Sequence, residues 1–89
     1  MKTIWKFSLV LMDAQEIAMP AGAVILALQT QNEAPCIWAL VDAEEPVHET
    51  RIFRTVGTGH SADVASKGTY VGTYQIRGGQ LVFHVFEMA

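Results

Sequence analysis

Two runs of alternating residues meet at a pair of glycines near the C-terminal end of the chain. Residues 69–77 and 80–87 flank Gly78-Gly79, a dipeptide typical of the tight primed turns of β-hairpins. With this turn, Ile76 opposes Leu81 and Tyr74 opposes Phe83. The face expected to be core carries Tyr70, Tyr74, Ile76, Leu81, Phe83 and Val85. The opposite face mixes polar and apolar side chains, as interfaces and pockets do: Val71, Thr73, Gln75, Arg77, Gln80, Val82, His84 and Phe86.

The rest of the chain has the same period of two, which indicates half-buried strands. Further strands are expected at residues 3–11, 16–19, 23–31, 36–42 and 50–56. No segment has the period of an amphipathic helix, and residues 61–66 form at most one helical turn. The sequence therefore predicts an all-β protein, a small antiparallel sandwich or partly open barrel of about seven short strands.

A second hairpin is expected between residues 23–31 and 36–42. If Asn32-Glu33 forms a two-residue loop, Leu28 faces Ile37 and Leu26 faces Ala39 across the ladder. Pro35 interrupts the pattern close to the turn, so the register stays open by a residue or two.

Eighty-nine residues predict a single domain, 1–89, with a small core. Cys36 is the only cysteine, so no disulfide forms within one chain. The hydrophobic content of 51% is high for a small domain and favours a homo-oligomer that buries additional apolar surface. No signal peptide and no apolar run of about 18 residues is present, which predicts a cytoplasmic protein without a membrane partner.

The net charge of -3 is unevenly distributed. Residues 1–49 hold two lysines against seven acidic residues, whereas residues 50–86 hold four basic residues against Asp63 alone. The overall acidity argues against nucleic-acid binding. The basic second half remains compatible with a pocket for one small anion.

The residues best suited to bind an anion are clustered in segment 51–60, Arg-Ile-Phe-Arg-Thr-Val-Gly-Thr-Gly-His. An arginine offers a planar fork of donors for phosphate or carboxylate, and glycine lets the backbone approach a ligand. The candidate ligand-binding residues are Arg51, Arg54, Thr55, Gly57, Thr58, Gly59 and His60, joined by Arg77 and His84 from the last hairpin.

A simpler interpretation of this segment is structural. The arginines would be surface residues paired with Glu44, Glu45 or Glu49, and the glycines would serve only a turn or bulge. The alternation does not determine which face of this strand points into the core. If Ile52 and Val56 point into the core, Arg54 is buried between them and must be paired. If Phe53 is core, Arg51 and Thr55 flank it instead.

No constellation of catalytic residues is recognisable. The chain has no nucleophile elbow, P-loop, dinucleotide fingerprint or metalloprotease helix. His48, His60 and His84 do not have the spacing of a zinc site. We therefore expect a protein that is not an enzyme and has no metal or cofactor.

Several stretches resemble a family of short phage and prophage proteins of unknown function. They are Met-Lys-Thr-Ile-Trp-Lys-Phe (1–7), Met-Pro-Ala-Gly-Ala (19–23), Pro-Cys-Ile-Trp-Ala-Leu-Val-Asp (35–42), Phe-Arg-Thr-Val-Gly-Thr-Gly-His (53–60) and the segment 71–87. The resemblance runs from end to end, and it implies a phage or prophage origin and action in the bacterial cytoplasm. The family has no assigned catalytic residues, so the resemblance transfers none to this chain.

Two functional hypotheses result, beside a third option, an enzyme that acts on a nucleotide and depends on His60. The first is a non-enzymatic, homo-oligomeric binding module that binds or sequesters a small phosphorylated, nucleotide-like ligand and so counteracts host antiviral defence. The second is a protein–protein interaction module that inhibits or adapts a host or phage partner.

Overall fold

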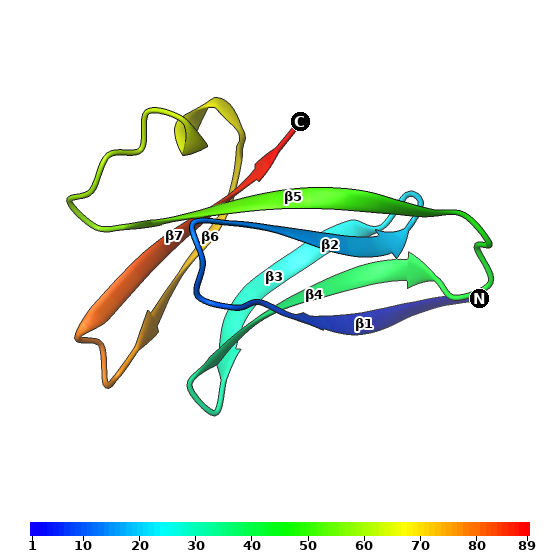
Figure 1. Ribbon diagram of the computed structural model, residues 1–89. Helices are drawn as coiled ribbons and strands as arrows, with labels where there is room; N and C mark the ends of the chain where they lie inside the picture. The colour runs from blue at the N-terminus through cyan, green and yellow to red at the C-terminus, as the bar shows by residue number, and fades with distance from the viewer.

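A computed structural model describes residues 1–89 and contains seven β-strands and one short 3-10 turn (Figure 1). The strands are β1 (Lys2–Ser8), β2 (Ala14–Pro20), β3 (Val24–Gln31), β4 (Ala34–Asp42), β5 (His48–Gly57), β6 (Thr69–Ile76) and β7 (Leu81–Met88), and the 3-10 turn η1 covers Ala65–Lys67. The predicted all-β class is confirmed. No helix in the structure is of the length and apolarity needed to cross a bilayer.

The strands form two antiparallel sheets. One has the order β1-β4-β3 and the other the order β2-β5-β7-β6, so the structure is a sandwich and not a closed barrel. The sheets come close together where β3 passes β6 (Figure 1). A methyl group at Gly72 would lie 3.1 Å from Cβ of Leu28, and glycine therefore permits this close approach. The two hairpin turns are also linked, since the Gly78 amide donates to Oε1 of Glu33.

The core lies between the two sheets and draws on the inner face of each. Its buried residues are Leu9, Met19, Ala23, Leu28, Ile37, Ala39, Val41, Phe53, Tyr74 and Val85. Phe53 is completely buried, which settles the orientation of β5. Because side chains alternate along a strand, Arg51 and Thr55 share the inner face with Phe53, and Arg54 lies on the outer face.

The hairpin of β3 and β4 follows its predicted register only near the turn. Asn32 and Glu33 both have positive φ, at 52° and 66°, as a primed two-residue turn requires, and Leu28 pairs with Ile37. The predicted pairing of Leu26 with Ala39 is wrong, because the register shifts between Ile25 and Ala27. Ile25 faces Ala39 instead, and Leu26 is left half exposed.

The hairpin of β6 and β7 has the predicted pairs Ile76 with Leu81 and Tyr74 with Phe83. The prediction that Tyr70 is core is wrong. The register shifts between Tyr70 and Gly72, so that Tyr70 opposes Phe86 on the outer face. Tyr70 is 56% exposed, and its ring packs edge-on against Phe86. One additional residue in a strand thus reverses every side chain beyond it.

Candidate functional site

Arg51 lies near the start of β5 and makes three hydrogen bonds within the protein. Its Nε donates to Oε2 of Glu87, its Nη2 donates to Oε1 of Glu87 at 2.9 Å, and its Nη1 donates to the Ala23 carbonyl at 2.6 Å. The two side chains are only 17% and 21% exposed. The hydrogen bonds to Glu87 raise the pKa of Arg51 above its usual value.

This geometry corrects the acidic partner that the structural interpretation predicted for Arg51. Its partner is Glu87, at the end of β7, and not Glu44, Glu45 or Glu49. The two meet because Glu87 pairs with Phe53 in the ladder and so faces inward beside Arg51. Three of its five N–H donors are used within the protein and the side chain is largely buried, and we therefore leave Arg51 out of the proposed site.

The opposite end of β5, at Gly57, is open and holds two adjoining pockets. The first, which we call the apolar pocket, has a volume of about 460 Å³ and is lined by Leu11, Met12, Asp13, Thr55, Gly57, Thr58, His60, Gln80, Leu81, Val82 and Phe83. The second, the arginine pocket, has a volume of about 340 Å³ and is lined by Asp13, Arg54, Thr55, Val56, Gly57, His60, Ser61, Val64 and Ala65. Both volumes lie within the usual range for small-molecule sites.

The apolar pocket lies between the start of β7 and the connection from β1 to β2. The side-chain amide of Gln15 fixes this connection, because it donates to the Val10 carbonyl and accepts from the Val10 amide. The amide of Thr55 also donates to the Asp13 carbonyl at 3.0 Å. These bonds position the apolar wall of residues 11–12 opposite Leu81 and Phe83.

One buried polar atom next to the two pockets has no hydrogen-bond partner. Thr55 is 8% exposed, and its Oγ1 is buried without a hydrogen bond. An unsatisfied buried hydroxyl costs about 1–3 kcal/mol. Thr55 lines both pockets, but this oxygen has less than 1 Å² of accessible area and therefore does not face their open space.

The arginine pocket lies beneath the loop that follows β5, drawn at the left of Figure 1. Unlike Arg51, Arg54 makes no ion pair with any carboxylate, and it lines this pocket together with His60 and Ser61. The loop is held by buried Ala65 and by Gly68, where a methyl group would lie 2.5 Å from the Glu87 carbonyl oxygen. A guanidinium, an imidazole and a hydroxyl around one pocket suit a small anion.

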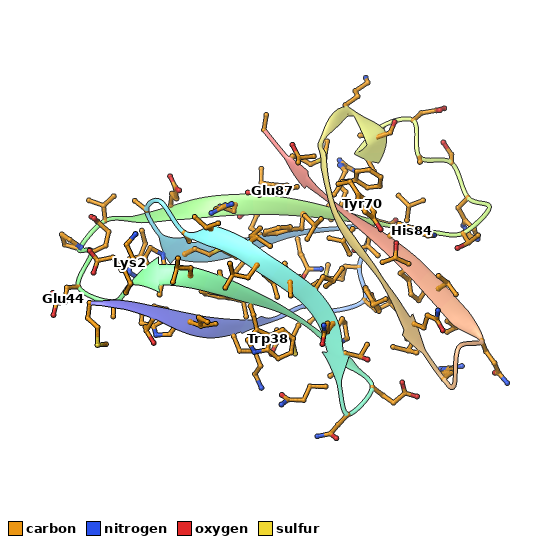
Figure 2. The ribbon with its side chains drawn as sticks, turned by 180° about the vertical axis from the view of Figure 1, so that it is seen from behind. Lys2, Trp38, Glu44, Tyr70, His84 and Glu87 are labelled. Atoms are coloured by element: carbon orange, nitrogen blue, oxygen red, sulfur yellow. The ribbon has the colours of Figure 1, made fainter.

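His84 belongs to a different cluster, on the outer face of the four-stranded sheet. Its Nε2 is 2.7 Å from Oγ1 of Thr58 and its Nδ1 is 2.9 Å from Oγ1 of Thr73, which in turn bonds the Tyr70 hydroxyl. Figure 2 labels His84 and Tyr70, which come from the neighbouring strands β7 and β6. Neither side chain lines either pocket.

The fold brings together only part of the predicted site. Residues lining at least one pocket are Arg54, Thr55, Gly57, Thr58 and His60. Arg51, Arg77, Gly59 and His84 line neither. Arg77 is exposed in the turn between β6 and β7, and Gly59 serves a turn in which its φ is +85°.

Sequence reasoning missed the residues that reach the pockets from elsewhere in the chain. Asp13 lines both pockets, and Leu11 and Met12 form a wall of the apolar pocket. They lie more than 40 residues before Thr55 in the sequence, and only strand pairing brings them together. No group of three or more His, Cys, Asp or Glu side chains in the structure is arranged to hold a metal ion.

The fold thus defines a small antiparallel β-sandwich with two joined pockets at one end. The chain matches the model of a domain family of unknown function, DUF7352, over residues 1–89, and it belongs to that family. The resemblance to a family of unknown function is confirmed at this level. No curated protein and no solved structure matches the chain.

Proposed function

We propose that this protein is a non-enzymatic binding module that holds a small phosphorylated, nucleotide-like ligand at the Gly57 end of β5. The observation that carries the proposal is Arg54. It has no carboxylate partner, and it lines a pocket with His60 and Ser61 that continues into the apolar pocket. An unpaired guanidinium presents a fork of donors that matches phosphate geometry.

The surrounding charges limit where the anion can bind. Asp13 lines both pockets, and its carboxylate repels a phosphate that approaches closely. The phosphate therefore belongs on the Arg54 and Ser61 side of the arginine pocket. The apolar pocket then receives the uncharged part of the ligand.

The proposal includes a biological setting taken from the resemblance to short phage and prophage proteins. In a bacterial cytoplasm, such a module would sequester a nucleotide-derived signal of host antiviral defence. A binding protein acts in this way without chemistry, in keeping with the absence of a catalytic constellation in the sequence.

Differential scanning fluorimetry and calorimetry with inorganic phosphate, pyrophosphate and nucleoside monophosphates test this proposal. At 100 times Kd, a ligand specific for the native state adds about 2.7 kcal/mol to the free energy of unfolding, a readily measured rise in Tm. Arg54→Ala should remove the effect and Arg77→Ala should keep it. The proposal fails if no phosphate compound stabilises the protein, or if Arg54→Ala binds as tightly as wild type.

A second candidate function, self-association or docking of a partner protein, is favoured by the outer face of the three-stranded sheet. Leu40 of β4 pairs with Ile4 of β1 on one side and with Val24 of β3 on the other. Ile4 and Val24 are each about half exposed, and Trp38 lies on the same face two residues from Leu40 (Figure 2). A contiguous apolar face of this kind is typical of an interface.

Light scattering of the wild type and of Ile4→Glu tests this second candidate. A charge in an apolar interface weakens association, so the variant should shift an oligomer towards the monomer. Lys2→Glu, at the margin of the same strand, is the matched control. A wild type that is monomeric at high concentration contradicts self-association.

A further inference from the structure

We infer that the outer face of the three-stranded sheet is covered by a second copy of this chain, packed face to face in a two-fold dimer. This inference rests on the second candidate function, self-association, and deepens it by naming the partner and the contact surface. It does not depend on the phosphate site, because Arg54 lies on the other sheet.

One chain alone buries little of itself. Only 14 of the 89 residues are buried, and the radius of gyration of 13.3 Å exceeds the value of about 12 Å expected for a compact domain of this length. The chain is a thin slab, with extents of 40, 29 and 16 Å along its principal axes. A partner that covers one broad face of the slab therefore adds a second region of buried apolar side chains.

The outer face of the three-stranded sheet has an apolar centre. Leu40 of β4 lies between Ile4 of β1 and Val24 of β3, its neighbours in the two ladders. Ile4, Val24 and Leu26, the last at the bulge of β3, are each about half exposed. Trp38 extends the apolar centre along β4, since residues two apart in a strand share a face (Figure 2). These side chains gain free energy when a partner removes them from water.

Polar groups surround the apolar centre. Lys2 pairs with Asp42 in the ladder at one end of the sheet. Towards the other end, Lys6 of β1 donates to Oε1 of Gln31 of β3 at 2.8 Å, so that this bond crosses β4. An apolar centre within a polar rim is the usual arrangement of a protein–protein interface. Because the rim carries charges of both signs, it does not repel a second copy as a rim of one sign would.

The size of the face determines how tightly the two copies associate. Three strands of seven to nine residues, about 4.8 Å apart and with a rise of about 3.3 Å per residue, form a face about 14 Å wide and about 26 Å long. Contact through its side chains buries on the order of 600 Å² on each copy, the lower limit for a specific interface. We therefore expect a reversible dimer whose population depends on protein concentration.

The free edge of β1 is a less suitable contact than the face. An edge strand can pair with another chain through its unpaired backbone groups, but lysines on the edge oppose such pairing. β1 carries Lys2 and Lys6 within seven residues. A second copy is also present wherever the chain is made, so that the apolar face does not stay exposed while a different partner is absent.

Sedimentation equilibrium over a series of concentrations measures the dimer. The wild type should approach twice the mass of one chain. Val24→Glu should weaken association at least about 100-fold, because it brings a charge into the apolar centre. Val64→Glu is the matched control and should associate as the wild type does, since Val64 is as exposed as Val24 but lies in the loop beside the other sheet.

The fluorescence of Trp38 locates the contact. Trp5→Phe leaves Trp38 as the only tryptophan of the chain. Its emission should shift to longer wavelength when the dimer is diluted into monomers, because water replaces the partner over the apolar centre. An emission that is unchanged by dilution, together with a Val24→Glu variant that dimerises as tightly as the wild type, would indicate pairing of β1 edges and overturn the inference.

A wild type that is monomeric at the highest attainable concentration would also overturn the inference, while leaving the phosphate site of the proposed function intact. A dimer that binds no phosphate compound would overturn the proposed function and keep the dimer. If both are correct, Arg54→Ala should dimerise normally, and monomeric Val24→Glu should bind phosphate compounds as the wild type does.

Discussion

Arg51 and Arg54 stand three residues apart on one strand and have opposite roles. Arg51 points inward, where both oxygens of Glu87 and the Ala23 carbonyl use its donors. Arg54 points outward, has no carboxylate partner and lines a pocket. The contrast follows from the alternation of side chains along β5. Phe53 is in the core, and Arg51 and Arg54 point to opposite faces because they are three positions apart.

The two ends of the sandwich differ in the same way. At the Arg51 end, the turn after β2 and the end of β7 close over the strand through hydrogen bonds. At the Gly57 end, the chain leaves β5 as a loop that folds over the outer face, and two pockets remain. At the first end Arg51 stabilises the fold through its pair with Glu87. At the second end Arg54 has no carboxylate partner and lines a pocket.

The largest expected effect tests the fixed role of Arg51. Arg51→Met leaves Glu87 unpaired in a position that is four-fifths buried, and we expect a loss of about 2–4 kcal/mol in the free energy of unfolding, somewhat less than for a completely buried pair. Arg54→Met should change it by less than about 0.5 kcal/mol. Urea denaturation measures both, and equal losses would abolish the distinction between the two arginines.

A somewhat smaller effect is expected at Gly68, which anchors the loop over the open end. In Gly68→Ala the new methyl group would lie 2.5 Å from the Glu87 carbonyl oxygen and 2.7 Å from Sδ of Met88. Overpacking of this kind costs about 1–3 kcal/mol. The His60 resonances in NMR spectra should shift as the loop moves, whereas exposed Ser66→Ala should preserve both stability and spectrum.

Arg77 provides a third arginine for the comparison, and a small gain is expected there. Its φ is +53°, in the left-handed region where a side chain costs about 1–2 kcal/mol. Arg77→Gly removes this strain at some cost in backbone entropy, so the net gain should be at most about 1 kcal/mol. Thermal denaturation measures it, and a loss of stability would indicate that the Arg77 side chain contributes contacts.

The smallest effect at neutral pH is expected at Tyr74. Its hydroxyl is buried without a partner, so Tyr74→Phe should be neutral or stabilising by up to about 1 kcal/mol. Burial raises the pKa of Tyr74 above its ordinary value of 10.0. The stability linked to the neutral phenol is therefore complete below pH 10.0 and is lost as the pH rises through the folded-state pKa.

Alkaline denaturation of the wild type and Tyr74→Phe measures this difference. The variant should retain more of its stability above pH 10.0, and Tyr70→Phe, which changes an exposed tyrosine, should behave as the wild type does. An identical alkaline decline in all three proteins would contradict the role assigned to Tyr74.

Alternation and turn residues were sufficient to predict the strands, because each is a local property. Gly78-Gly79 marked the turn of the last hairpin and its register near the turn, as the pairs of Ile76 and Tyr74 confirm. The bulges beside Leu26 and Val71 were not predictable, since the insertion of one residue leaves the local alternation unchanged. Each bulge altered which side chains reach the core.

The candidate site was predictable only along β5. Arg54, Thr55, Gly57 and His60 are close in the sequence, so a local motif could bring them together. Asp13 and the apolar residues before it reach the pockets through the pairing of β2 with β5. The partner of Arg51 lies 36 residues away, and no local pattern connects the two.

The hydrogen bonds of Thr58 connect the apolar pocket to a histidine that lies outside it. Thr58 lines the apolar pocket, and its hydroxyl is bonded to His84, which lines neither pocket. A ligand that displaces Thr58 would break the hydrogen bond at Nε2 of His84, and the change would reach Thr73 and Tyr70 through Nδ1. If the pocket binds the proposed ligand, the NMR resonances of the His84 ring should therefore shift, although His84 does not line the pocket.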